Sequence, residues 1–300
     1  MGSLFAWAIA RGGAELWAYD VWQDHVDVIN RDGLAIRQGS SVHTARIQAV
    51  SDARRAPPCD AVMVFAKFNQ TRAALEGARP MIAPNTIIVT LQNGIGNVEL
   101  IASMFPDHTV VFGLTTLTSE LLGPGRIEAS YIGRGETYLW ASDGDLRKVE
   151  SLCDVLMKGG INAHPTPNIE LKIWQKLIVN CCLNPVCAIA GASVGAVTDV
   201  PESWPLIEAV ADEIVAAAQA EKIPLNRADA HAFLRAVAEE ARNHEPSMLI
   251  DVRNRRTTEI ECLNGEVVRI CERHGLPAPY NRSLYLMIRT IEQASAKRHS

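Results

Sequence analysis

The sequence predicts an α/β fold, with an N-terminal Rossmann-like doubly wound parallel sheet followed by an all-α C-terminal domain. In the first half, apolar runs of strand length at 61–66 and 86–91 alternate with helical segments, as in a sheet covered on both faces. In the second half every long segment is typical of a helix. His-Pro-Thr-Pro at 164–167 indicates a boundary, so we expect domains at 1–165 and 166–300.

The elements of the first half are assigned from apolar runs and glycine stops. Paired glycines at positions 12 and 13 suit the end of the first helix. In chain order we expect a helix at 4–10, a strand at 14–19, a helix at 24–31, β structure in two pieces over 34–50, a strand at 61–66, a helix at 69–78, a strand at 86–91, a helix at 98–104 and a strand at 109–112.

From residue 125 the pattern changes to short antiparallel segments. We expect a hairpin that pairs 126–128 with 137–140 around Gly133 and Gly135, then a helix at 145–158 and a last strand at 161–163. The predicted helices that follow are 169–184, one from 188 onward, 204–221, 228–243, 248–256, 259–274 and 280–296.

Composition excludes several classes of function. The 300 residues carry a formal net charge of -5 and contain no long basic run. Both features argue against a nucleic-acid or anionic-membrane partner. We find no apolar run long enough to span a membrane and no signal peptide, so we expect a cytoplasmic protein. The seven cysteines lack C-x-x-C spacing, which predicts buried reduced thiols and no metal site.

Two polar groups follow buried strands. Lys67 ends the 61–66 run, and Gln-Asn-Gly-Ile-Gly at 92–96 ends the 86–91 run. Ligands of doubly wound sheets bind at the carboxyl ends of strands, so Lys67 and Asn93 are candidate cofactor contacts. Asn-Gly is also ordinary turn chemistry, and Asn93 could serve the turn alone.

The dinucleotide signal is fragmentary. Gly2 could be the third glycine of a G-x-G-x-x-G turn, and Asp20 lies where an acid binds the ribose, although it could instead cap the next helix. The first β-strand and most of the glycine-rich loop are missing before Gly2, either through a late start or through truncation. We therefore expect a sheet with an exposed central edge.

A polar stripe organises the helical half. Lys176, Asn180 and Asn184 recur at i, i+4 and i+8, which places them on one helical face among apolar residues. Buried polar groups need hydrogen-bonding partners. The stripe is either a set of core residues satisfied by backbone or a cleft wall that holds a polar, anionic small molecule.

The motifs resemble those of the ketopantoate reductases, over essentially the whole chain. Residues 174–185 are similar to the family's W-x-K-L…N…N-P helix, and 247–261 to its S-M-x-x-D…T-E-I-(D/E) segment. Residues 92–96 match its N-G-x-G turn and Lys67 its strand-end lysine.

The resemblance implies reduction of 2-dehydropantoate to pantoate by NADP or NAD, a step toward pantothenate and coenzyme A. It implies that Lys176 is the general acid, that Glu259 orients it, and that Asn180, Asn184 and Ser247 hold the substrate. Asn93 and Lys67 would face the cofactor and Gly2 its pyrophosphate. The expected partner is a small 2-oxo acid, and a homodimer is possible.

Several alternatives stay open. Lys176 and Glu259 could form a structural ion pair. Ser247 could serve only as the N-cap of the helix that follows it. Asp20, with no nearby arginine, accepts from a ribose 2′-hydroxyl and repels a 2′-phosphate, which favours NADH.

Val194 stands where the family often has asparagine, so one substrate hydrogen bond is either lost or supplied by Ser193, which argues against strict specificity for 2-dehydropantoate. A reductase of another branched 2-oxo acid is one alternative. Two other hypotheses remain. The chain could be a catalytically silent homologue that binds a metabolite or partner, or it could be a helical interaction protein.

Overall fold

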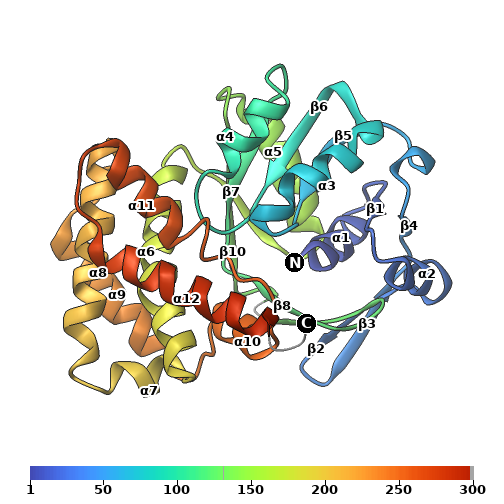
Figure 1. Cartoon of the computed structure of the whole chain (residues 1–300). Helices are drawn as coiled ribbons and strands as arrows, with labels where there is room; N and C mark the ends of the chain where they lie inside the picture. Colours follow the sequence, from blue (N-terminus) through green and yellow to red (C-terminus); the bar gives the residue numbers. More distant parts are fainter. Residues whose placement is uncertain (131, 298–300) are drawn as a thin grey trace. The chain divides into compact units, whose positions relative to one another are not determined.

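The computed structural model describes residues 1–130 and 132–297 (Figure 1). It contains two compact units. The α/β unit comprises Met1–Gln92 and Asn97–Ile169, and the helical unit begins at Glu170 and also includes the short segment Asn93–Gly96. The predicted fold class, an α/β region followed by an all-α region, is confirmed.

The largest sheet of the α/β unit has five strands in the order β11-β10-β7-β6-β5. β5, β6 and β7 run parallel to one another, and in the last two of these strands Ile88, Val89 and Val111 are fully enclosed. β10 runs antiparallel to β7 and parallel to β11. The strands are β5 (Cys59–Val64), β6 (Ile82–Thr90), β7 (Val110–Thr115), β10 (Glu136–Ala141) and β11 (Asn162–Pro165).

A separate pair of parallel strands, β1 (Trp17–Tyr19) and β4 (Gln48–Val50), completes the strands of the doubly wound part. In the described part of the chain, β1 and β5 each lie at the end of their own sheet and are not hydrogen-bonded to one another.

The third sheet has the order β3-β2-β9-β8, and it corrects two predictions. The expected hairpin between 126–128 and 137–140 is wrong, because β9 pairs with β8 and β2 whereas β10 belongs to the five-stranded sheet. The tight turn is instead at Gly123–Gly125, where both glycines have positive φ. Residues 34–50 form three strands, not two: β2 (Leu34–Gln38), β3 (Ser41–Ala45) and β4; the others are β8 (Thr118–Gly123) and β9 (Arg126–Ser130).

Helices cover these sheets. α1 and α5 approach so closely that a Cβ on Gly12 would lie 2.2 Å from the Val155 carbonyl oxygen, and one on Gly159 would lie 2.0 Å from that of Ala8. Both glycines at the helix ends are therefore needed for packing as well as for termination. The helices are α1 (Gly2–Arg11), α2 (Gln23–Asp32), α3 (Thr71–Gly77), α4 (Asn97–Met104) and α5 (Leu146–Lys158), with short 3-10 helices η1 (Ala53–Arg55), η2 (Phe68–Gln70) and η3 (Arg79–Met81).

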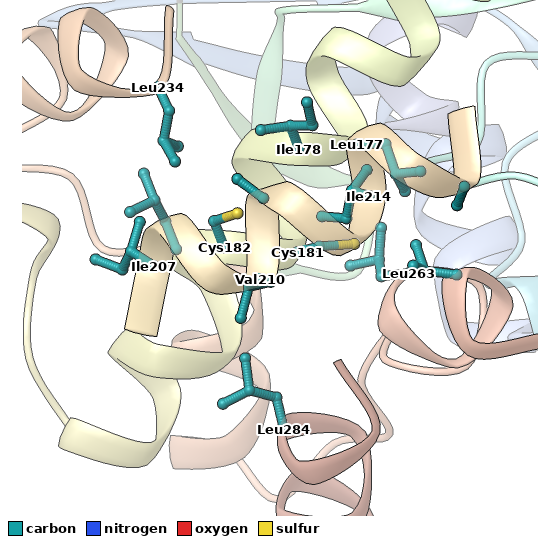
Figure 2. Close-up of a cluster of buried hydrophobic side chains, with 14 of the residues drawn as sticks. Leu177, Ile178, Cys181, Cys182, Ile207, Val210, Ile214, Leu234, Leu263 and Leu284 are labelled. Atoms are coloured by element: carbon teal, nitrogen blue, oxygen red, sulfur yellow. The ribbon is translucent and has the colours of Figure 1, made fainter. Parts of the chain in front are cut away.

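The helical unit is built around one apolar core (Figure 2). Leu177, Cys181 and Cys182 of α6 pack against Ile207 and Ile214 of α8. All seven cysteines are free thiols and six are buried, which confirms the reduced-thiol prediction. The helices are α6 (Ile169–Ala190), α7 (Val194–Thr198), α8 (Ser203–Ala220), α9 (Arg227–Glu240), α10 (Ser247–Arg253), α11 (Asn264–Arg273) and α12 (Pro279–Lys297).

Two further predictions need correction in this unit. We expected no apolar run long enough to span a membrane. Among the described residues, one helix, α6, is long enough and apolar enough to do so by length and composition. Its apolar side chains contribute to the core, as in a core helix of a globular protein. The helix predicted at 259–274 begins only at Asn264, because Thr258–Leu263 forms turns whose polar groups bond to other segments.

Pro185 lies inside α6 and links this helix to the start of α11. Proline has no amide hydrogen, so the carbonyl of Cys181 loses its usual i+4 donor. Asn264 replaces that donor, since its Nδ2 lies 3.0 Å from the Cys181 oxygen and 2.9 Å from Asn281 Oδ1. Asn281 in turn donates to Glu213 at 2.7 Å. A buried polar chain thus fixes the point at which α11 begins.

Candidate active site

The polar stripe of α6 has partners in the helical unit. Lys176 Nζ donates to Asn93 Oδ1 at 2.8 Å, and Asn93 Nδ2 donates to Glu259 Oε2 at 2.9 Å. All three residues belong to the same compact unit, because Asn93–Gly96 is grouped with the helices. The structure therefore brings together a cation, an amide and a carboxylate that are far apart in the sequence.

The charges fix the orientation of the Asn93 amide. An ammonium group can only donate hydrogen bonds, and an ionised carboxylate can only accept them. The amide oxygen must then face Lys176 and the amide nitrogen must face Glu259. Asn93 thus serves both charged groups at once, and turning the amide over would break both bonds.

Burial changes the acidity of Lys176. Desolvation lowers its pKa from 10.5 to about 8, and the nearby negative charge of Glu259 acts in the opposite direction. At pH 7 the lysine is still mostly protonated, yet it releases its proton far more readily than an exposed lysine does. A general acid needs both properties near neutral pH.

A short irregular loop, Thr258–Leu263, holds Glu259 in place. The amide and hydroxyl of Thr258 both donate to Glu292 Oε1 of α12, each at 2.7 Å. The same hydroxyl accepts from the amide of Ile260 at 3.2 Å. Glu261 is held by Arg269 at 2.7 Å. Side chains on both sides of Glu259 are therefore anchored to helices, which orients its carboxylate.

The remaining predicted substrate contacts lie on α6 and α10. Asn180 and Asn184 follow Lys176 along α6, and Asn184 is nearly enclosed with 8% of its surface exposed. Ser247 is exposed and is the first residue of α10, whose N-cap is Pro246. Ser247 therefore does not occupy the capping position that the alternative interpretation assigned to it.

The predicted cofactor contacts of the α/β unit lie at separate element ends. Asp20 is exposed after β1, and its Oδ1 accepts from the amide of Trp22 at 2.9 Å. Lys67 follows β5 and precedes η2. Gly2 begins α1, where a Cβ would lie 3.4 Å from Phe65 Cβ, an ordinary contact distance. An exposed carboxylate after a parallel strand fits a ribose with a free 2′-hydroxyl.

Sequence reasoning missed two residues beside this site. It predicted a cofactor contact for Asn93 and did not predict the bonds of its side chain to Lys176 and Glu259. It gave no role to Cys262, whose carbonyl oxygen accepts from the amide of Ile95, or to Gly94 beyond turn formation. The glycine in Asn-Gly was the only available signal, since it marks a backbone that approaches another segment closely.

Family models match both parts of the chain. Residues 1–144 match "Ketopantoate reductase PanE/ApbA", and residues 168–292 match "Ketopantoate reductase PanE/ApbA C terminal". The 2-dehydropantoate 2-reductase of Vibrio cholerae is 33% identical over 238 residues, which cover 79% of each chain. That of Streptococcus pyogenes is 28% identical over 294 residues, which cover 97% of this chain and 95% of the relative.

Solved structures agree with these matches. A D-mandelate dehydrogenase in complex with NADH and anilino(oxo)acetate is 28% identical with a TM-score of 0.91, covering 99% of this chain and 96% of that one. A PanE/ApbA family ketopantoate reductase from Ralstonia eutropha is 27% identical with a TM-score of 0.88, covering 97% and 95%. The chain therefore belongs to the ketopantoate reductase family and is an NAD(P)-dependent oxidoreductase of that type.

Proposed function

We propose that this protein reduces 2-dehydropantoate to pantoate, with Lys176 as the general acid. The observation that carries the proposal is the bonded series Lys176–Asn93–Glu259. The family supports reduction of a 2-oxo acid, and the names of the curated relatives support 2-dehydropantoate as the substrate.

The residues of this chain supply the proton. When bound, the nicotinamide supplies the hydride that reaches the carbonyl carbon. Negative charge then develops on the carbonyl oxygen, and Lys176 stabilises it as a cation before donating its proton. Asn93 and Glu259 keep the ammonium group in one orientation, so that this proton is available without rearrangement.

Substrate recognition follows from the same polar face. A 2-oxo acid carries a carboxylate next to its ketone, and 2-dehydropantoate carries a hydroxyl as well. Amide groups of Asn180 and Asn184 and the hydroxyl of Ser247 are donors suited to these oxygens. Asn184 is nearly enclosed, so its amide requires a partner and gains from a bound anion.

We also propose that NADH is used at least as well as NADPH. The argument rests on Asp20, an exposed carboxylate at the end of β1. It accepts a hydrogen bond from a 2′-hydroxyl, whereas its charge repels a 2′-phosphate. Support also comes from the D-mandelate dehydrogenase, whose structure was solved with NADH.

A substrate panel tests both proposals. The purified protein is assayed with 2-dehydropantoate, 3-methyl-2-oxobutanoate and phenylglyoxylate, each with NADH and with NADPH. We expect the largest kcat/KM for 2-dehydropantoate with NADH. A kcat/KM at least tenfold higher with NADPH would reject the cofactor assignment, and turnover of none of the three acids would reject the reductase assignment.

A second candidate is a reductase of a different 2-oxo acid. The similarity to D-mandelate dehydrogenase favours it, and so does Val194, which begins α7 where the family often supplies asparagine. A valine side chain has no donor group to offer the hydroxyl of 2-dehydropantoate. The panel separates the candidates, because this alternative predicts that phenylglyoxylate or 3-methyl-2-oxobutanoate has the highest kcat/KM.

A further inference from the structure

We infer that Gly94 and the backbone of Cys262 are positioning residues for the proton donor, because together they hold Asn93 between Lys176 and Glu259. This inference rests on the proposed function. It adds two residues that act through Asn93, and neither is assigned to contact the substrate or the cofactor.

The first observation is that the turn after β6 is attached to the Glu259 loop. The amide of Ile95 donates to the carbonyl oxygen of Cys262 at 3.2 Å. Cys262 Sγ lies 3.5 Å from the Asn93 carbonyl oxygen and 3.4 Å from that of Glu259. Cys262 therefore contacts the backbone of both residues that hold the bridging hydrogen bond.

The second observation is that only glycine fits at position 94. Its φ is +81°, which side-chain-bearing residues rarely adopt. A Cβ at this position would also lie 2.2 Å from the Cys262 carbonyl oxygen and 2.8 Å from Cys262 Sγ. Turn chemistry explains the positive φ, but it does not explain an approach this close to another segment.

The geometry of the bridge makes this attachment consequential. The two bonds of Asn93 are 2.8 Å and 2.9 Å long, within the range of about 2.7–3.2 Å that such hydrogen bonds adopt. Moving the turn away from Cys262 by one ångström would weaken both. Burial raises the pKa of the Cys262 thiol, so the thiol is neutral and acts here through packing.

Two substitutions separate this role from ordinary turn formation. Gly94→Ala adds a Cβ and disfavours the positive φ, whereas Gly94→Asn adds the same Cβ with a residue that tolerates positive φ. Gly191→Ala is the matched control, because Gly191 has a φ of +67° in the same unit and nothing within 4 Å of its Cβ position. The control therefore carries the backbone strain without the collision.

Steady-state kinetics over a pH series is the first readout. We expect both Gly94 variants to lose roughly 10- to 100-fold in kcat, the size of loss that a small misplacement of a catalytic group produces. Their alkaline limb should move to lower pH, since Lys176 loses an acceptor that favours its charged form. Gly191→Ala should keep kcat within about twofold, as surface substitutions usually do.

A double-mutant cycle with Asn93→Ala shows whether Gly94 acts through Asn93. If it does, Gly94→Ala should cost little in the Asn93→Ala background, because the group that it displaces is already gone. The same large loss in both backgrounds would overturn the inference, as would a Gly94→Asn variant with wild-type kcat and an unmoved alkaline limb.

The titration of Lys176 gives a readout that does not depend on the substrate. The rate of reductive methylation of Lys176, followed by mass spectrometry across pH, reports its pKa in each folded variant. A lower pKa in Gly94→Asn than in Gly191→Ala supports the positioning role even if no tested 2-oxo acid is turned over. An unchanged pKa overturns it. Cys262→Ala alters no backbone atom, so it should lower the pKa of Lys176 by less than the Gly94 variants do. It provides the test if the Gly94 variants do not fold.

Discussion

The two units of this protein prepare their polar groups in different ways. In the helical unit, Lys176, Asn93 and Glu259 are bonded to one another, and their loop is anchored to α12. In the α/β unit, Asp20 lies just after β1, and its carboxylate accepts a local hydrogen bond from the amide of Trp22. The proposed acid–base groups are thus organised before a ligand binds, and such preorganisation favours catalysis.

The packing of the two units shows the same contrast. The helical unit has one large apolar core that includes most of its helices. The apolar residues of the α/β unit form three separate clusters, and its doubly wound strands are divided between two sheets. The proposed proton donor, Lys176, therefore lies in the unit with the more continuous core.

The largest effect is expected for Lys176→Met, which keeps the stem of the side chain and removes the proton donor. We expect kcat to fall by about 10²- to 10⁴-fold, the usual contribution of a general acid. Stability should rise at pH 7, because the depressed pKa means that the ionised lysine is disfavoured in the native state by about 3 kcal/mol.

The size of that stability gain depends on pH. The penalty is fully present below pH 8 and disappears as the pH rises from 8 to 10.5, because the native lysine has lost its proton there while the unfolded one still holds it. Urea unfolding of the variant and the wild type at pH 7 and pH 10.5 measures the change. Lys172→Met, one turn earlier on α6, is the control, and an equal stability gain there would contradict the assignment.

Asn93→Asp tests the bridge itself. A second carboxylate beside Lys176 should raise the lysine pKa above its native value of about 8, and it repels Glu259. In the wild type we expect reduction to slow above pH 8 and oxidation of the product to accelerate there, because oxidation needs the neutral amine. In the variant both limbs should move to higher pH, with kcat roughly tenfold lower at pH 7. Unmoved limbs in a pH-rate series would exclude Asn93 as the neighbour of the titrating group.

A smaller effect on catalysis is expected from a substitution in the α/β unit. It removes one proposed contact with the cofactor and leaves the Lys176–Asn93–Glu259 bonds intact. Asp20→Asn removes the charge that favours NADH, so the ratio of kcat/KM for NADH to that for NADPH should fall by about tenfold. Asp24→Asn, in the first turn of α2, is the control and should leave the ratio unchanged. Parallel assays with NADH and with NADPH measure this ratio for the wild type and both variants.

The smallest effect on catalysis, but a clear one on stability, is expected for Asn264→Ala. It leaves the Cys181 carbonyl without the donor that replaces the amide missing at Pro185. We expect a loss of about 1–3 kcal/mol in the free energy of unfolding, with kcat within a few-fold of the wild type. Chemical denaturation measures this loss, and exposed Asn254→Ala should cost much less.

Local patterns were sufficient for much of this architecture. Apolar runs predicted β5, β6 and the core helix α6, and the spacing of Lys176, Asn180 and Asn184 identified the polar face. The hairpin at 126–140 failed because strand partners are chosen by tertiary contacts, and β9 found its partners in β2 and β8. Helix periodicity likewise continued through 259–263, where side-chain anchors to α12 override it.

The bonding partners of Asn93 could not be predicted from the sequence for a related reason. Its position after β6 suggested a cofactor contact, since strand ends in such sheets bind ligands. Its actual bonds are with residues of the helical unit, and no local pattern reports which unit a turn joins. The same holds for Cys262, whose contacts with the Asn93–Gly96 turn come from both its backbone oxygen and its thiol.

The bridge through Asn93 also has a consequence for the order of folding. Its two bonds join residues separated by 83 and 166 positions along the chain. Contacts of such long sequence separation require most of the chain to be ordered first. They therefore form late in folding and slow the overall folding rate. Helical structure should therefore recover early after dilution from denaturant, and reductase activity should return last, as a direct report of the moment at which Asn93 reaches Lys176.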